Sequence, residues 1–167
     1  CGICPTCGDG SCDYHPLYGE TYHNCSEDCE TPPDCDAAVC LNILNVNTDA
    51  GTLDIHMINQ PGCADTDDPS IFDKTMTENE CNGPDNPSQA IGTWFDGNVA
   101  GFQFVISNAS MIVESVTGGT ALDLDWSIQF AVNNSETIFL GFSFDQIPIP
   151  PGEGTLITIS FTDYADE

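Results

Sequence analysis

The second part of the chain alternates apolar and polar residues with a period of two, and this pattern restricts the fold more than any other feature. Apolar side chains recur at every second position in five segments: 52–58, 102–106, 126–132, 138–144 and 155–161. Gly, Asn, Asp and Pro separate these segments, and none of the segments shows a convincing helical period. Short alternating strands between turn residues predict a mostly β protein built as an antiparallel β-sandwich.

The alternation also predicts which side chains share one face of each strand. These sets are Leu53, Ile55 and Met57; Phe102, Phe104 and Ile106; Trp126, Ile128, Phe130 and Val132; Ile138, Leu140, Phe142 and Phe144; and Ile157, Ile159 and Phe161. Asp54 and His56 fall on the opposite, polar face of the first of these strands, so His56 is expected to face solvent. Gly101 and Gly141 stand at strand positions where a close backbone approach or a bulge is expected.

The composition changes near residue 38, which predicts two parts. Residues 1–37 have almost no apolar periodicity and predict a small, irregular, disulfide-rich module, whereas residues 38–167 predict the β-sandwich domain. A polar insertion at about 63–97 interrupts the alternation and is too polar for a core of its own. Long insertions are often functional, here as a contact surface or as a second metal loop at Asp65, Asp67 and Asp68, and the alternative is a tolerated decoration.

Cysteine usage indicates an oxidising compartment. The ten cysteines are Cys1, Cys4, Cys7, Cys12, Cys25, Cys29, Cys35, Cys40, Cys63 and Cys81. An even number, clustered in a Gly-, Pro- and Asp-rich stretch, predicts a disulfide framework and an extracellular or cell-surface location. The pair within the insertion is expected to bond and close a loop. The Cys4-Pro-Thr-Cys7 spacing leaves zinc binding or redox chemistry as alternatives. The cysteines after Cys7 form no further Cys-x-x-Cys for a zinc site, and no helical pattern follows that would lower a thiol pKa.

The charge balance bounds the partners. The chain has 27 acidic residues against one cation, Lys74, which gives a formal net charge of −26. Such a chain cannot neutralise phosphates, so nucleic acid and anionic membranes are excluded as partners. No apolar run approaches the roughly 20 residues that a membrane span needs. Self-repulsion must be offset by bound cations, by high salt or by positive partners. Specific divalent-cation binding is favoured because the acids are unevenly spread, and adaptation to brine is the alternative.

The N-terminal module is the predicted calcium site. Short Asp-Gly turns held by disulfides bring several oxygens to one point, as a hard cation such as Ca²⁺ requires. The expected ligands are Asp9, Asp13, Glu20, Asn24 and Asp28. The pattern Cys-Gly-Asp-Gly-Ser-Cys-Asp at 7–13, followed by Gly-Glu and by Cys-Ser-Glu-Asp-Cys, resembles a small cysteine-rich repeat of extracellular microbial proteins. Residues 14–18 lengthen the loop relative to that pattern, and a cysteine after the Gly-Glu-Thr is absent.

Four motifs follow one another in the second part of the chain: Gly-Thr-Leu-Asp-Ile at 51–55, Val-Ala-Gly-Phe-Gln-Phe at 99–104, Leu-Gly-Phe-Ser-Phe at 140–144 and Ile-Pro-Pro-Gly-Glu-Gly-Thr-Leu at 149–156. In these motifs and their order, residues 38–62 and 98–163 resemble cohesin-like domains of secreted proteins. The resemblance implies a cohesin-like jelly roll and a binding role rather than catalysis. Physically, prolines at 148, 150 and 151 cannot donate in a strand ladder, so that segment is expected to be a loop or an edge.

Three Asn-x-Ser sequons mark candidate glycosylation sites at Asn24, Asn108 and Asn133. The chain begins at a cysteine, which suggests a processed mature protein or a piece of a longer one.

Catalysis is not expected. Asp123 and Asp125 could pair, but 27 acids guarantee coincidental pairs, and oxyanion stabilisation lacks its usual cationic donors. His15 and His23 could join a metal site instead. The sequence therefore predicts a non-enzymatic, calcium-stabilised structural protein that assembles with itself or with another extracellular protein, as a subunit of a surface fibre or appendage. Unpaired strand edges could carry that assembly.

The alternative function is recognition. A carbohydrate- or protein-binding module of a larger secreted protein could use Trp94, Phe95, Tyr14, Tyr18 and Tyr22 to stack on sugars if they are exposed. Packing of the first two against the sandwich is the other interpretation.

Overall fold

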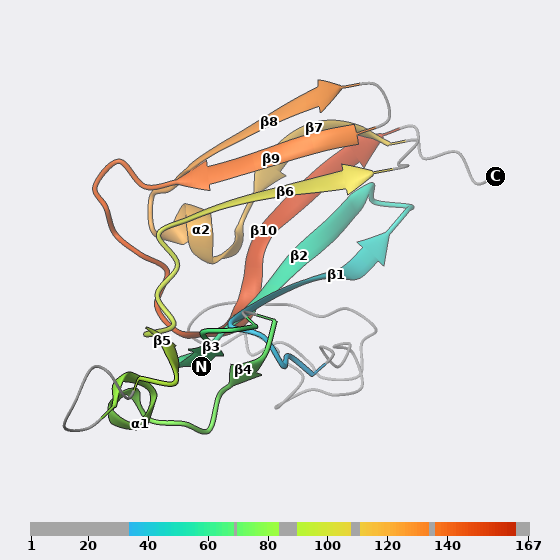
Figure 1. Ribbon diagram of the computed structural model, residues 1–167. Coiled ribbons are helices and arrows are strands. Elements are labelled where there is room, and N and C mark those ends of the chain that lie inside the picture. Colours follow the sequence, from blue (N-terminus) through green and yellow to red (C-terminus); the bar gives the residue numbers. More distant parts are fainter. Residues whose placement is uncertain (1–33, 69, 84–89, 108–110, 134–135, 163–167) are drawn as a thin grey trace, which may run out of the picture.

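The computed structural model describes residues 34–68, 70–83, 90–107, 111–133 and 136–162. Two antiparallel sheets form a sandwich, and a smaller sheet lies below one end of it (Figure 1). The mostly β fold with antiparallel sheets is thus confirmed. The predicted module at 1–37 falls almost entirely outside the described residues.

The first sheet of the sandwich has four strands in the order β1-β2-β10-β7. They are β1 (Val39–Asn47), β2 (Thr52–Asn59), β10 (Gly152–Thr162) and β7 (Ile112–Thr117). The central pair aligns Ile157 with Ile55, and all neighbours run antiparallel. β1 and β7 are therefore the two edges of this sheet.

The second sheet has three strands in the order β6-β9-β8, all antiparallel to their neighbours. They are β6 (Gly101–Ser107), β9 (Glu136–Phe142) and β8 (Ser127–Asn133). β6 and β8 both pair with β9, so they are the edges and run in the same direction.

The core lies between the two sheets. Three of the predicted inward faces are confirmed: β2 buries Leu53, Ile55 and Met57, β10 buries Ile157, Ile159 and Phe161, and β6 packs Phe102, Phe104 and Ile106 against this core. A bulge in β10 between Thr155 and Ile157 lets Leu156 be buried as well. Trp126 is 3% exposed just before β8, and its indole Nε1 donates to the Ile147 carbonyl at 2.9 Å.

The predicted face of 138–144 differs from expectation. The core takes Thr137, Phe139 and Gly141, whereas Ile138, Leu140 and Phe142 point outward. Phe144 lies beyond the strand and is 78% exposed. Both faces of β9 carry apolar side chains, so alternation by itself did not fix the orientation, and the partners β6 and β8 decided it.

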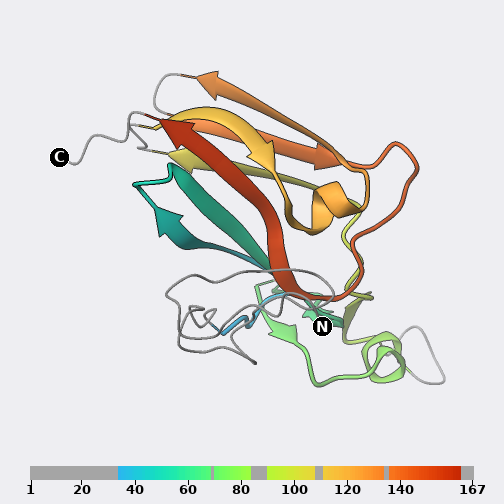
Figure 2. The same cartoon turned by 180° about the vertical axis from the view of Figure 1, so that it is seen from behind.

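The described residues include two short helices, although no segment of the sequence shows a convincing helical period. α1 (Glu78–Asn82) begins at Thr77, whose hydroxyl and backbone N–H exchange hydrogen bonds with Glu80 in a capping box. α2 (Gly119–Asp123) has Gly118 as its N-cap and begins at Gly119, both with positive φ, and it contacts β10 of one sheet and β8 of the other (Figure 2). One turn of helix is too short to show a 3.6-residue period in sequence.

The insertion is more ordered than its polarity suggested. It forms a three-stranded sheet in the order β4-β3-β5, from β3 (Gly62–Asp65), β4 (Phe72–Asp73) and β5 (Gly92–Phe95). Along the chain, α1 lies between β4 and β5. Cys63 and Cys81 are bonded, as predicted, and both are buried. The disulfide supplies part of the core that the polar sequence lacks.

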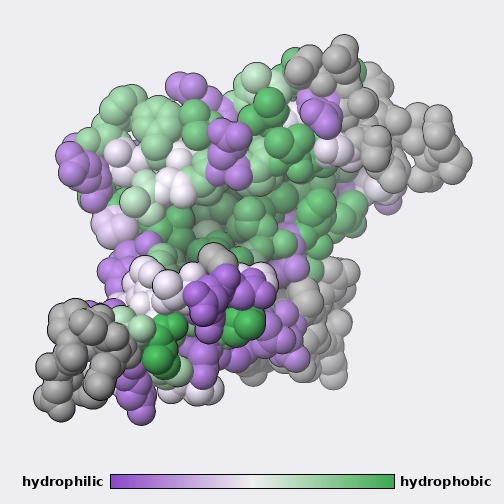
Figure 3. All heavy atoms as spheres, viewed as in Figure 1, coloured by the Kyte–Doolittle hydropathy of each residue, from purple (hydrophilic) through white to green (hydrophobic). Residues whose placement is uncertain are grey.

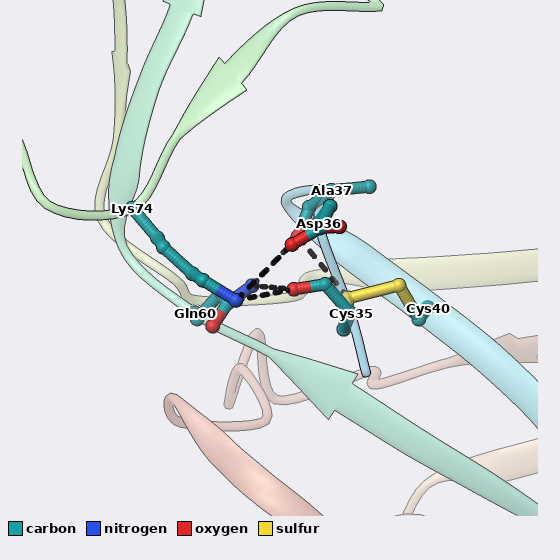
Figure 4. The surroundings of a disulfide bond; sticks show 6 residues. All are labelled: Cys35, Asp36, Ala37, Cys40, Gln60 and Lys74. Atoms are coloured by element: carbon teal, nitrogen blue, oxygen red, sulfur yellow. Dashed lines mark hydrogen bonds and ion pairs between the residues drawn. A yellow bond between two sulfur atoms is a disulfide. The ribbon is translucent and has the colours of Figure 1, made fainter. Parts of the chain in front are cut away.

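A second disulfide joins Cys35 to Cys40 and spans the composition change near residue 38 (Figure 4). Lys74 from the insertion donates to the Cys35 carbonyl at 2.9 Å and lies 3.4 Å from an Asp36 carboxylate oxygen. Gln60 Nε2 donates to the carbonyls of Cys35 and Ala37. The single cation of the chain thus holds the start of β1 against the insertion.

Candidate functional site

Among the described residues, the sheet opposite β1 has one strand fewer than the sheet that contains it, and this leaves the β1 side of the sandwich open. Its core-facing residues Val39, Leu41 and Ile43 lie beside the buried face of β2, with Leu41 opposite Met57. Leu41 is 38% exposed and Ile43 is 50% exposed, whereas Met57 is 4% exposed. The four-stranded sheet is therefore one strand wider than the sheet that covers it.

The opposite side of the opening is β6. Phe102, Phe104 and Ile106 point toward the core from this edge strand and stay only partly buried. Figure 3 shows a hollowed apolar surface in the region between β6 and the β1–β2 pair. We call the surface formed by Val39, Leu41 and Ile43 together with these three β6 residues the edge groove.

The other side of the sandwich is closed more fully. α2 packs against β10 and β8, so it bridges the two sheets there, as the rear view shows (Figure 2). Ala121 of α2 is completely buried. The edge groove is thus a feature of one side of the molecule.

The edge groove also has free backbone hydrogen-bonding groups. Among the described strands, β1 pairs with β2 alone and β6 with β9 alone. An edge strand presents a row of unpaired N–H and C=O groups, which an added strand can satisfy. Strands in a sheet lie about 4.8 Å apart, so one strand added to β6 would extend the shorter sheet by that distance toward the open side of the sandwich, where β1 lies.

Covering the groove would be favourable. Full burial of a Val, Leu or Ile side chain is worth about 1.5–3 kcal/mol. The three β1 side chains are already partly buried, so each would gain on the order of 1 kcal/mol when covered. The arrangement can therefore bind an extended apolar segment through both its backbone and its side chains.

The predicted calcium ligands Asp9, Asp13, Glu20, Asn24 and Asp28 lie outside the described residues, as do Cys1, Cys4, Cys7, Cys12, Cys25 and Cys29. The first metal site stays a prediction.

The second predicted metal loop follows β3. The Asp65 carboxylate accepts the backbone N–H groups of Asp67 and Asp68 at 2.8 and 3.0 Å. Asp68 accepts both the backbone N–H and the hydroxyl of Ser70, and these bonds lower the pKa of Asp68. Within the described part of the chain, no three His, Cys, Asp or Glu side chains gather as a metal site would require. The loop's own hydrogen bonds account for two of the three carboxylates.

The other candidate side chains are dispersed. Phe95 packs against the sandwich core and Trp94 is half-buried beside Cys63, while the three tyrosines lie outside the described residues. Asp123 and Asp125 are both exposed at the end of α2.

His56 does not face solvent as expected. It is half-buried, and its Nε2 atom is buried without a hydrogen-bond partner. Burial lowers the pKa of His56, and the carboxylates of Glu153 and Asp54 partly oppose that shift. The outer face of β2 is therefore less open to water than its polar sequence indicated.

Asn24 and Asn108 of the sequons lie outside the described residues, and Asn133 is the last residue of β8. None of the helices that the structure describes has the length and apolar character of a membrane span.

Sequence reasoning missed the β1 half of the edge groove. The order Val39-Cys40-Leu41-Asn42-Ile43 does alternate, which was the available signal for a strand. Exposure of its apolar face depends on how many strands the opposite sheet has, and alternation carries no information on that number.

Comparison with known proteins gives no relative on which to base a function. No protein-family model matches the chain, and no curated protein or solved structure matches it either.

Proposed function

We propose that this protein is a non-enzymatic structural subunit of an extracellular assembly, such as a surface fibre or appendage. The edge groove is the observation that carries the proposal. An apolar, unpaired sheet edge promotes aggregation of a protein that functions as a monomer. The simplest explanation for such an edge is that another strand covers it in an assembly.

The disulfides support the extracellular part of this proposal. Cys35–Cys40 and Cys63–Cys81 are formed within the described residues, and such bonds persist in oxidising compartments. The cohesin-like resemblance of the sequence points in the same direction, toward a secreted binding or assembly module.

Calcium is the proposed stabiliser. The net charge of −26 needs compensation, and the one Lys of the chain, Lys74, lies 3.4 Å from an Asp36 carboxylate oxygen, which leaves the other carboxylates without a Lys or Arg partner. Ca²⁺ bound by carboxylates of the 1–37 module would offset part of the repulsion between acids within one copy and between copies.

Light scattering of the native protein tests the proposal. We expect polymers in millimolar calcium that shrink when excess EDTA is added, because chelation restores the repulsion between acidic copies. Sodium chloride at matched ionic strength is the control, since adaptation to brine predicts that bulk salt replaces calcium. A monomer under all three conditions would contradict the proposal and favour a recognition module, which glycan and protein-partner screens would then examine.

A further inference from the structure

Three of the four edge strands of the sandwich carry no charged residue. β1, β6 and β8 contain neither Asp, Glu nor Lys, although 17% of the whole chain is charged. Natural proteins usually protect exposed edges with charged side chains, proline or bulges against pairing with a second sheet. The carboxylates of this acidic chain are absent from β1, β6 and β8, so charge repulsion does not prevent these strands from pairing with another strand.

The β8 edge offers side chains suited to the edge groove. Phe130 and Val132 lie on the core-facing side of β8, opposite Phe139 and Thr137 of β9. They nevertheless remain 37% and 58% exposed. One copy therefore presents an incomplete apolar groove at β6 and an incompletely buried apolar strand at β8, on opposite edges of the same sheet.

We propose that β8 of a second copy pairs with β6, extends the three-stranded sheet and covers Val39, Leu41 and Ile43 of β1. The inference rests on the proposed function and names the partner of the edge groove. β6 and β8 both run antiparallel to β9, so in a head-to-tail repeat β8 of one copy runs parallel to β6 of the other. Successive copies are also rotated about the strand direction, because the four-stranded sheet is one strand wider and its edges β1 and β7 would coincide after a pure translation. Such a contact uses different surfaces on the two copies, and with a rotation that does not close into a ring it generates a filament.

Charge favours a second copy over other partners. A basic partner would be recognised through carboxylates, and these three edge strands have none. A second copy carries the same net charge of −26, so it can approach most closely where both surfaces are uncharged.

Cysteine cross-linking tests the pairing directly. Gln103 of β6 and Gln129 of β8 both lie opposite Leu140 of β9, and both are exposed. Two strand spacings, about 9.6 Å, separate them within one copy. A disulfide needs Cα atoms within about 7 Å, so Gln103→Cys/Gln129→Cys can be bridged only between copies.

We expect the double variant to form a ladder of covalent oligomers on a non-reducing gel after mild oxidation, and each single variant to form none beyond background. Gln103→Cys/Ala131→Cys covers a two-residue shift in register. Peptide mapping identifies the new bond among the native ones. A dimer from Gln103→Cys alone would show β6 pairing with β6 and would overturn the head-to-tail arrangement.

A charged substitution in the edge groove, followed by light scattering, is the second test. Leu41→Asp should abolish the polymer seen by light scattering while the circular dichroism of the sandwich stays unchanged, because this side chain is already 38% exposed. Ile71→Asp, at a 57% exposed site in the insertion, is the matched control and should leave the polymer intact. Polymers that survive Leu41→Asp and form no β6–β8 bond would overturn this inference and leave the proposed function standing. A protein monomeric at every concentration would overturn both.

Discussion

Gly141 shows how one residue without a side chain sets the packing between neighbouring strands. It is buried in the middle of the three-stranded sheet, opposite Phe102 of β6. A Cβ atom at this position would lie 2.3 Å from the Phe102 ring. The absence of that atom lets the Phe102 ring lie across β9 and stack with Trp126 at a centroid distance of 6.0 Å.

Gly141→Ala should destabilise the protein by about 1–3 kcal/mol, since the added methyl forces the Phe102 ring out of its packed position. Gly152→Ala is the matched control, because its Cβ would meet no atom within 4 Å. The control should stay within about 0.5 kcal/mol of the wild type in urea unfolding. Equal stability of the two variants would show that the Phe102 ring does not depend on Gly141.

His56 makes stability depend on pH. Burial lowers the pKa of His56 below its usual 6.5, so the folded state favours the neutral ring. On acidification, the unfolded state therefore binds a proton at a higher pH than the folded state does. The contribution of His56 to the free energy of unfolding is present above about pH 6.5 and is lost as the pH falls below that value. Urea midpoints from about pH 7.5 to about pH 5 should therefore fall more for the wild type than for His56→Gln. Parallel profiles would assign the pH dependence to other groups.

At the scale of elements, the two described disulfides act on different parts of the chain. Cys63–Cys81 connects β3 to α1 across a sequence separation of 18, whereas Cys35–Cys40 closes a separation of 5 at the start of β1. The first organises the insertion, whose small sheet has few apolar residues of its own. The second, with Lys74 and Gln60, fixes where β1 enters the sandwich.

Cys63→Ala/Cys81→Ala should cost roughly 3 kcal/mol in chain entropy, because the bridge closes the longer loop. Cys35→Ala/Cys40→Ala should cost about 1 kcal/mol less by the same argument. Hydrogen exchange should show lost protection in β3 and β5 for the first variant, with β2 and β10 still protected. Simultaneous loss of protection in β2 would mean that the insertion and the sandwich unfold as one unit.

At the scale of the whole molecule, unequal sheets and unequal charge placement work together. Four strands face three, so the sandwich is open along β1 and β6. The exposed edge strands β1 and β6 contain no charged residue, although the chain has 27 acidic residues. Repulsion between copies is then weak along edges that also expose apolar side chains, which directs association to the edge groove.

The sequence by itself determined the β class, the antiparallel strands β2, β6 and β10 with their core-facing side chains, and the Cys63–Cys81 bond. Period-two alternation and cysteine number are local signals, and these features follow from local rules. It could not orient β9, because Ile138, Leu140 and Phe142 alternate as well as Thr137 and Phe139 do. It also did not reveal the short helices or the strands of the insertion.

The edge groove was decided by tertiary structure alone. Val39, Leu41 and Ile43 alternate as buried residues do, and their exposure arises because the opposite sheet ends one strand short. Strand number and sheet order depend on contacts between distant segments, such as β10 with β2 and β9 with β6, which no local pattern encodes. The burial of a side chain depends on the strand that packs against it as well as on its own strand. The sequence of one strand therefore specifies which side chains can be buried, but it does not specify whether another strand covers them.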